Sequence, residues 1–366
     1  MQFTCSKANL LTAIGTVNRA ASKMQKSILE CILFSCSQEN ITLKATDIAL
    51  SIKTELDAQI VQEGEAAIPA RLLYEIINRF PDSDVNFKSM GENSVEISCL
   101  NSNVVLQQMN PEEFPAFPVL EKKEQIKIPQ NMLRSMINQT LFAAAVSEDK
   151  PILTGLLFDI GKDSLTLVAL DGYRMAVRRQ QAISDIEKNC VIPARTLREV
   201  SRIIEDNEEN VKISISGNMA LFEANHTQIF TRLLEGDYIN YKNLLPKDCA
   251  TSVKVETGML KDSIERASIL AREGSNNVIK FEITDKNLNI SSNSEMGNID
   301  EKIPVITEGK DLKIAFNAKY VLDVLKCVDD PEVLMQYNTS VSPCIVKQEN
   351  SDMYEYLILP VQLRED

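Results

Sequence analysis

The sequence predicts an α+β protein made of three tandem copies of one domain, each with two helices packed on antiparallel sheets. A helical segment recurs at a fixed spacing of 124 residues, and the same order of helices and strands surrounds each occurrence. The strand segments alternate apolar and polar residues. The length of 366 residues exceeds what one hydrophobic core usually organises. Copies of roughly 120 residues have the size of ordinary domains.

The recurring helix begins at Ala70, Ala194 and Ala318, in the segments ARLLYEII, ARTLREVS and AKYVLDVL. A basic residue follows each alanine. In the first copy the apolar residues return every three or four positions, which places them on one face of a helix. These residues are Leu72, Leu73, Ile76, Ile77 and Phe80.

Each copy also opens with an amphipathic run and closes with alternating, strand-like segments. The opening runs are residues 8–17, 131–142 and 258–270, and the closing segments are residues 94–109, 220–234 and 343–359. Such alternation suits antiparallel sheets with one face toward water. The predicted domains are residues 1–122 (N-terminal), 123–246 (central) and 247–366 (C-terminal), with linkers at residues 120–127 and 244–252.

One aspartate repeats with the helices. Asp47 in LKATDIALSIK and Asp171 in LVALDGYRMAVRR are 124 residues apart, whereas the third copy, LNISSNSEMGNIDEKI, has lost the aspartate. An enzyme that uses these two carboxylates is one alternative. It is disfavoured because the third copy lacks the group and neither a nucleophile nor a metal partner accompanies the other two.

Composition restricts the function classes. The 52 acidic residues exceed the 39 basic residues, and the net charge of −13 argues against attachment to nucleic acid or anionic membrane by bulk charge. No apolar run approaches the roughly 20 residues of a membrane span, and the N-terminus lacks an export pattern. A cytoplasmic location is therefore expected.

The residue types used in metal and covalent chemistry are sparse or scattered. The eight cysteines lack the paired spacing of a zinc site, and we expect most of them to be buried in a reduced compartment. The single histidine, His226, falls in an expected turn. Glycine-rich phosphate motifs are absent from the sequence. No cofactor, no metal and no catalytic residue is predicted.

Basic residues recur on the repeated helices. Arg195, Arg198 and Arg202 share one face of the second-copy helix. Such a recurrence in an acidic protein predicts a shared, locally positive surface that contacts phosphates without reading bases, while the acidic residues face elsewhere. Further basic residues on the repeated and opening helices are Arg19, Lys23, Arg71, Arg79, Arg134, Lys261, Arg266, Lys319 and Lys326.

Taken in order, these segments resemble the bacterial β sliding clamps, the processivity subunits of DNA polymerase III. The resemblance runs from Met1 to about Leu363. It rests on the threefold repeat, the IPAR-type helix starts, ATDIALSI, ALDGYRMAV, EEFPAFP at Glu112–Pro118 and the terminal YLILPVQL. It implies a head-to-tail homodimer in which each chain forms half of a six-domain ring. Duplex DNA would pass through the ring without sequence specificity and without catalysis.

The resemblance also implies partners and a location. The polymerase III alpha subunit, the clamp loader and other proteins with a clamp-binding motif would insert a peptide into a hydrophobic cleft, which confers processivity. The protein would be cytoplasmic and nucleoid-associated, as in bacteria. The cleft residues would be Leu153, Leu170, Gly172, Tyr173, Arg174, Met175, Ile239, Asn243, Leu244, Val341, Leu357, Leu359, Pro360, Val361 and Leu363.

Several positions depart from the commoner residues of the family. Tyr173 replaces a frequent histidine, Ile239 a proline, Asn243 an arginine and Val104 an aromatic residue, and an acidic extension, RED, follows Leu363. The dimer contact would pair the last strand of copy one, around Val104 and Leu106, with the edge of copy three near Ile269 and Leu270. The DNA-facing residues would be Arg19, Lys23, Arg71, Arg79, Arg134, Lys150, Arg195, Arg198, Arg202, Arg266 and Lys319. A scaffold that binds peptides but not DNA is a second alternative.

Overall fold

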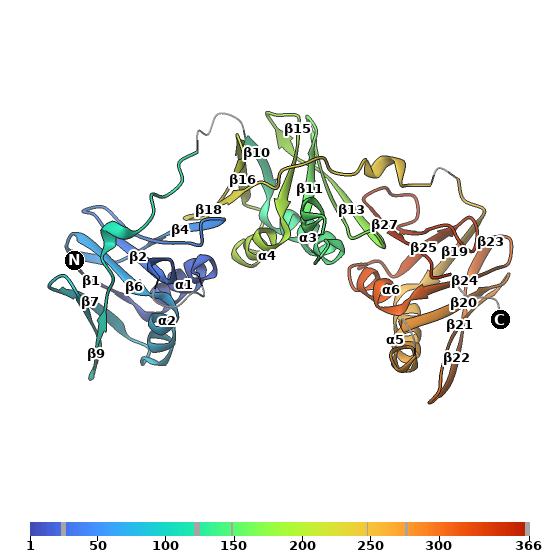
Figure 1. Ribbon diagram of the computed structural model, residues 1–366, viewed down its shortest axis with the longest axis horizontal. Helices are drawn as coiled ribbons and strands as arrows, with labels where there is room; N and C mark the ends of the chain where they lie inside the picture. The colour runs from blue at the N-terminus through green and yellow to red at the C-terminus, as the bar shows by residue number, and fades with distance from the viewer. Residues whose placement is uncertain (23–26, 121–124, 148, 247, 275–276, 363–366) are drawn as a thin grey trace. The chain divides into compact units, whose positions relative to one another are not determined.

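The computed structural model describes residues 1–22, 27–120, 125–147, 149–246, 248–274 and 277–362 (Figure 1). The chain divides into two compact units. Unit 1 contains Met1–Asn131 and Glu199–Leu233, and unit 2 contains Met132–Arg198 and Leu234–Asp366. The division passes through helices α3 (Gln130–Thr140) and α4 (Ala194–Ile203), so it falls inside the second repeat.

The first sheet of unit 1 has the strand order β5-β1-β7-β8-β9, and β9 is its edge. Its pairs are antiparallel. Phe3 of β1 and Phe87 of β7 stack with ring centroids 4.8 Å apart in the buried interior. The strands are β1 (Gln2–Ser6), β5 (Gln59–Gln62), β7 (Asp84–Met90), β8 (Ser94–Cys99) and β9 (Ser102–Gln107).

The second sheet of unit 1 joins strands of two repeats, in the order β10-β16-β17-β18-β4-β3-β2-β6. The first-repeat strand β4 pairs antiparallel with the second-repeat strand β18, so that Leu50 lies opposite Thr231. One sheet thus continues from the first repeat into the second. The strands are β2 (Cys31–Cys36), β3 (Ile41–Thr46), β4 (Leu50–Leu56), β6 (Gly64–Pro69), β10 (Gln125–Pro129), β16 (Asn210–Ser216), β17 (Met219–Ala224) and β18 (Thr227–Arg232).

Helices α1 (Lys7–Val17) and α2 (Ala70–Arg79) of the first repeat lie side by side (Figure 1). The Ser6 hydroxyl accepts a hydrogen bond from the Asn9 backbone N–H at 3.2 Å and so caps α1. The predicted apolar faces are buried in part: Ile14 in α1 and Leu73 and Ile77 in α2 are fully covered, whereas Leu72 is 43% exposed. Short 3₁₀ helices follow at η1 (Asn18–Ala20), η2 (Ile28–Glu30) and η3 (Pro111–Glu113).

The larger sheet of unit 2 joins the second repeat to the third, in the order β15-β11-β12-β13-β27-β26-β25-β19-β23. Strand β13 pairs antiparallel with β27, so that Arg174 lies opposite Ile358. The strands are β11 (Gly155–Ile160), β12 (Ser164–Leu170), β13 (Arg174–Gln181), β15 (Lys188–Pro193), β19 (Thr251–Glu256), β23 (Ile306–Gly309), β25 (Glu332–Tyr337), β26 (Cys344–Lys347) and β27 (Tyr354–Ile358). A short strand, β14, covers Ile183–Ser184.

The smaller sheet of unit 2 has the order β22-β21-β20-β24, with β22 at its edge. Helices α5 (Thr257–Glu273) and α6 (Ala318–Leu325) lie side by side, and α5 packs on β21 and β22. The Asn317 side chain caps α6 by accepting from the Lys319 N–H at 3.0 Å. The remaining elements are β20 (Val278–Ile283), β21 (Asn287–Ser294), β22 (Gly297–Pro304), β24 (Leu312–Asn317), η4 (Leu141–Ala143), η5 (Pro151–Thr154) and η6 (Tyr241–Asn243).

The predicted α+β class with tandem helices and antiparallel sheets is confirmed. Two local predictions differ from the structure. Residues assigned to the linkers begin strands, β10 at Gln125 and β19 at Thr251, because the short apolar alternation there continues the neighbouring sheets. His226 lies in a turn between β17 and β18 as expected, next to Asn225 with a φ of 51°.

Candidate functional site

A hydrophobic cluster in unit 2 gathers apolar residues from both sides of the β13–β27 junction. Four of the predicted cleft residues belong to it: Leu153, Leu170, Met175 and Leu357. All four are buried. The cluster is completed by Leu157, Val168, Val177, Val191, Tyr241 and Ile345, with Ala145, Ile152, Leu234, Tyr238 and Leu245 packed against it.

The repeated aspartate shapes the turn that leads into β13. The Asp171 Oδ1 accepts hydrogen bonds from the backbone N–H groups of Tyr173 and Arg174, at 2.9 and 3.0 Å. Gly172, between Asp171 and Tyr173, has a φ of +91°, which glycine adopts without steric cost. Asp47 makes the equivalent bonds in the first repeat, to the N–H groups of Ala49 and Leu50. The aspartate therefore repeats because it closes a turn.

Arg174 lies almost wholly buried beside this turn. Its Nε donates to the Asp171 Oδ2 at 3.0 Å, its Nη1 to the Asp323 Oδ2 at 2.6 Å and its Nη2 to the Phe142 carbonyl at 2.8 Å. The guanidinium also faces the rings of Tyr320 and Phe142, 4.6 and 5.3 Å from their centroids. Asp323 and Tyr320 belong to α6 of the third repeat. Arg174 therefore joins two repeats, and each of its three guanidinium nitrogens already makes a hydrogen bond within the chain.

Exposed apolar side chains stand close in the chain to members of the cluster. Tyr173 is 61% exposed and stacks on Tyr320, with centroids 6.0 Å apart. Burial raises the pKa of Tyr320, helped by the Asp171 carboxylate, so its hydroxyl remains neutral at physiological pH. Exposed apolar groups next to a buried apolar cluster are typical of a site that awaits a partner. The exposed members of the predicted cleft are Tyr173, Ile239, Leu244, Val341 and Leu359.

Two tyrosines that were not predicted from the sequence take part in the cluster: Tyr241 belongs to it and Tyr238 packs against it. The Tyr241 hydroxyl donates to the Asp159 Oδ2 at 2.8 Å, and the Tyr238 hydroxyl donates to the Val168 carbonyl at 3.3 Å. Burial raises the pKa of both phenols, and the Asp159 carboxylate raises that of Tyr241 further. Their spacing was available as a signal, because Tyr238 and Tyr241 stand 124 residues after Phe114 and Phe117.

The remaining predicted cleft residues take other positions. Asn243 is exposed in η6, Pro360 and Val361 are half-buried, and the Val361 N–H donates to the Ala315 carbonyl at 2.8 Å. Leu363 lies outside the described residues.

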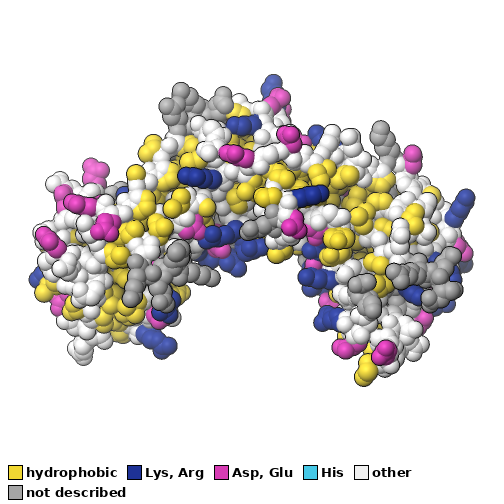
Figure 2. Space-filling view, in the orientation of Figure 1, with side chains coloured by type: hydrophobic (Ala, Val, Ile, Leu, Met, Phe, Trp, Pro, Cys, Tyr) yellow, Lys and Arg dark blue, Asp and Glu magenta, His cyan; other side chains and the backbone are white. Residues whose placement is uncertain are grey.

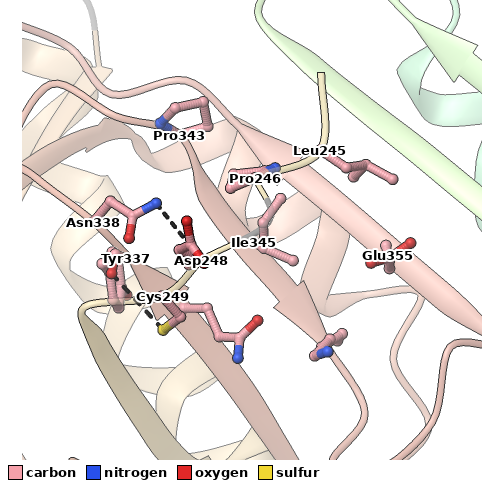
Figure 3. A pocket seen from close by; sticks show the side chains of 11 residues that line it. Leu245, Pro246, Asp248, Cys249, Tyr337, Asn338, Pro343, Ile345 and Glu355 are labelled. Atoms are coloured by element: carbon pink, nitrogen blue, oxygen red, sulfur yellow. Dashed lines mark hydrogen bonds between the residues drawn. The ribbon is translucent and has the colours of Figure 1, made fainter. Parts of the chain in front are cut away.

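A polar pocket of about 170 Å³ adjoins the cluster. Leu245 and Ile345 line the pocket and also contact the cluster (Figure 3). Beyond them the walls are polar, and the Asn338 side chain donates to the Asp248 carbonyl at 2.9 Å. The Cys249 thiol faces this pocket, with its Sγ 3.8 Å from the Tyr337 carbonyl (Figure 3).

Several basic residues predicted to face DNA are bound to carboxylates. In unit 1, Arg19 and Arg202 both bond Glu199, at 2.9 and 3.2 Å, and Arg71 bonds Glu75 at 3.2 Å. On the face drawn in Figure 2, acidic side chains lie next to basic ones. The expectation that acidic residues face elsewhere is therefore wrong for these three arginines.

The other predicted DNA-facing residues are placed as follows. In unit 2, Arg266 bonds Glu301 through both Nε and Nη2, at 2.8 Å each. Lys23 lies outside the described residues. Arg79, Lys150, Arg195, Arg198 and Lys319 are exposed, and Arg134 is half-buried.

The predicted dimer residues lie on two different kinds of element. Val104 and Leu106 lie on β9, the edge of the first sheet of unit 1. Ile269 and Leu270 lie on helix α5 of unit 2, and β22 is an edge strand of the smaller sheet of that unit. Because α5 packs against β22, Ile269 and Leu270 lie on a helix beside this edge, and their part in a dimer contact stays a prediction.

Across the described ranges, no group of three or more His, Cys, Asp and Glu side chains is placed to hold a metal ion. None of the helices in the described part of the chain is both long and apolar enough to cross a membrane. Six cysteines are buried, Cys327 is half-buried and Cys249 is exposed.

Tandem α+β repeats that share sheets, with an apolar cluster at one of their junctions, indicate a clamp-type protein. Comparisons with known proteins support this class over nearly the whole chain. Residues 1–118, 127–240 and 242–362 match the family models for the N-terminal, central and C-terminal domains of the DNA polymerase III beta subunit. The chain is 32% identical to the beta sliding clamp of Staphylococcus aureus, with 99% of both proteins covered.

Two further relatives are similar over the same extent. The beta sliding clamp of Bacillus subtilis is 34% identical, with 99% of this chain and 100% of that protein covered. A solved structure of a putative DNA polymerase III beta subunit from Eubacterium rectale has a TM-score of 0.94 at 34% identity, covering 99% and 100%. The chain belongs to the DNA polymerase III beta subunit family. Its function is that of a DNA sliding clamp, a non-catalytic processivity factor.

Proposed function

We propose that two copies of this chain close head to tail into a six-domain ring around duplex DNA, with residues 1–122, 123–246 and 247–366 as the three domains of each copy. One observation carries this proposal. Sheets continue between successive repeats at β4–β18 and β13–β27, while the equivalent strands β22 and β9 are left as unpaired edges. Two complementary edges at the opposite ends of a repeat series favour closure with a second copy.

The repeat predicts the register of this closing pair. Leu50 lies opposite Thr231 in the first junction, and Arg174 lies opposite Ile358 in the second. The corresponding pair in the third junction is Asn298 of one copy opposite Gln107 of the other. Burial agrees with a missing neighbour, because Val105 on β9 is 56% exposed, whereas its counterpart Ile229 on β18 is 2% exposed.

Retention on circular DNA tests encirclement. The clamp, loaded by its cognate loader on nicked circular DNA, should remain bound in moderate salt and should be lost after the DNA is linearised. Topology, not tight phosphate contact, would then hold the protein in place. Equal retention on circular and linear DNA would refute encirclement. Peptide binding without any DNA retention would favour the scaffold alternative.

We further propose that the cleft on unit 2 takes short peptides from the polymerase III alpha subunit, the clamp loader and other partners. The buried cluster would receive apolar peptide anchors, while the exposed Tyr173 and Val341 would cover them. Arg174 would act by holding Tyr320 and α6 in place, since each of its guanidinium nitrogens already makes a hydrogen bond within the chain.

Calorimetric titration with such a peptide tests this site. Met175→Ala should weaken binding about tenfold, because it removes a buried wall of the cluster. Met335→Ala, which changes a buried methionine of the same sheet outside the cluster, is the matched control and should leave affinity nearly unchanged. Equal effects of the two substitutions would reject the assignment.

We assign the DNA contact mainly to the exposed basic residues of the repeated helices, including Arg195, Arg198 and Lys319. Removing one phosphate contact should lower the slope of log affinity against log salt by about one. Arg198→Gln should therefore weaken DNA binding across all sequences tested. An unchanged slope would remove Arg198 from the DNA-facing set.

A further inference from the structure

Among the described residues, two of the arginine–carboxylate pairs that connect successive repeats use an acid on the repeated helix. In unit 1, the Arg19 Nη1 of the first repeat donates to the Glu199 Oε2 of the second repeat at 2.9 Å. In unit 2, the Arg174 Nη1 of the second repeat donates to the Asp323 Oδ2 of the third repeat at 2.6 Å. Glu199 and Asp323 are 124 residues apart, at the same position of the repeated helices α4 and α6.

The first repeat carries the same acid without an equivalent partner. Glu75 of α2 lies 124 residues before Glu199. The side chains of Glu199 and Asp323 are 15% and 21% exposed, whereas that of Glu75 is 54% exposed. Its arginine is Arg71, one helical turn away on the same helix and itself 82% exposed. An exposed pair of this kind contributes little to stability and is easily exchanged.

The surface around Glu75 is also open where its counterparts are covered. Leu72 lies one turn before Glu75 on the same helix and is 43% exposed. The matching residues are Thr196, which is 3% exposed, and Tyr320, which packs on the Arg174 guanidinium. The neighbour that covers α4 and α6 is therefore missing at α2.

In both pairs the guanidinium group lies at the end of the first helix of the arginine's own repeat, which is the repeat before that of the acid. Arg19 belongs to η1, directly after α1, and Arg174 donates to the carbonyl of Phe142 in η4, directly after α3. The residue 124 positions after Phe142 is Arg266 of α5. The third repeat thus places its own arginine in the same segment.

Arg266 is held in the same manner as Arg174. The Arg174 Nε bonds a carboxylate of its own repeat, Asp171, and its Nη1 reaches the next repeat. The Arg266 Nε and Nη2 bond Glu301 on the edge strand β22, and the Nη2 also bonds the Ser263 hydroxyl. These bonds use Nε and Nη2 and hold the Arg266 guanidinium group beside β22, the strand that would meet a second copy.

We propose that Arg266 forms the third pair of this series, with Glu75 of a second copy of the chain, and that it closes the ring and does not contact DNA. This inference rests on the ring proposed above. Each closed ring would contain the pair twice, once at each subunit interface. The guanidinium would bridge Glu301 of its own chain and Glu75 of the other, as Arg174 bridges Asp171 and Asp323.

The test is a double-mutant cycle on the dimer dissociation constant of the full chain, measured by analytical ultracentrifugation over a dilution series. Glu75→Gln and Arg266→Gln should each raise the dissociation constant about tenfold, and the double variant should be no weaker than either single variant. Lys261→Gln, the same charge change on another side of α5, is the control and should leave dimerisation unchanged.

The outcomes separate this pair from the ring itself. Independent, multiplicative effects of the two substitutions would overturn the pair while leaving a dimeric ring intact. An unchanged dimer constant for Arg266→Gln, together with a lower salt slope for DNA binding, would return Arg266 to the DNA-facing set. A wild-type chain that stays monomeric at micromolar concentration would overturn the ring and the pair together.

Discussion

Replacing Arg174 tests whether one buried guanidinium holds two repeats together. Arg174→Met keeps most of the apolar stem but removes three hydrogen bonds, two of them to carboxylates. Breaking a fully buried ion pair typically costs about 3–5 kcal/mol. Here Asp171 and Asp323 keep 17% and 21% of their side-chain exposure, and Asp171 retains two backbone donors. We therefore expect a loss of about 2–3 kcal/mol in the free energy of unfolding, mostly from the stranded Asp323.

Urea denaturation followed by circular dichroism measures this loss, and a cycle with Asp323→Asn isolates the pair. The coupling between the two substitutions should be about 1–2 kcal/mol. Lys313→Met is the matched control, because Lys313 forms a surface pair with Glu282 at 2.8 Å, and its effect should stay within about 0.5 kcal/mol. A coupling below about 0.3 kcal/mol would show that the guanidinium does not join the repeats.

Three further predictions concern thiols, backbone and pH. Cys249 is exposed and should be the fast-reacting thiol in an Ellman titration at pH 8, since burial raises the pKa of Cys327 to about 11 and of Cys5 to about 12. A fast phase that remains in Cys249→Ser would contradict this prediction. Gly309→Ala should lower the free energy of unfolding, measured by a thermal melt, by about 2–4 kcal/mol, because φ is +114° and the new Cβ would lie 2.2 Å from the Ala250 carbonyl oxygen. The control Gly217→Ala, at φ +57° with open space around the new Cβ, should lower it by only about 1 kcal/mol, and similar losses for the two variants would refute the steric reasoning. The Arg266 hydrogen bonds lower the pKa of Glu301. The difference in the free energy of unfolding between the wild type and Glu301→Gln should therefore be constant above pH 5 and should disappear as the pH falls through that lowered pKa. If this difference persists at pH 2.5, the ion pair is not its cause.

The repeat made much of the fold predictable. Ala70, Ala194 and Ala318 each begin a helix as expected, because the apolar spacing and the fixed distance are both encoded locally. Three predicted cleft residues, Leu170, Met175 and Leu357, do meet in one buried cluster, because they lie on strands that pair at one junction; their part in a cleft stays a prediction.

The partners of the polar residues could not be predicted in the same way. Arg174 was expected among the cleft residues, yet Asp323, 149 residues away, accepts a hydrogen bond from its Nη1. Sequence periodicity reports which face of an element a residue lies on, but not which distant carboxylate meets it. Asp171 was considered as a catalytic group because it repeats, whereas its function is to close a turn through two backbone N–H groups.

The sheets that run from one repeat into the next have a consequence for dissecting the chain. At β4–β18 and β13–β27, a cut between repeats would strip backbone hydrogen-bond partners from two central strands. An excised middle repeat would then carry one bare strand on each side, and each bare strand would match the other. Such a fragment is built to polymerise end to end into open filaments, because nothing in it limits the number of copies. The three repeats are therefore expected to be exchangeable between relatives only as one unit. A single repeat transferred without its neighbours should form fibres more readily than soluble protein.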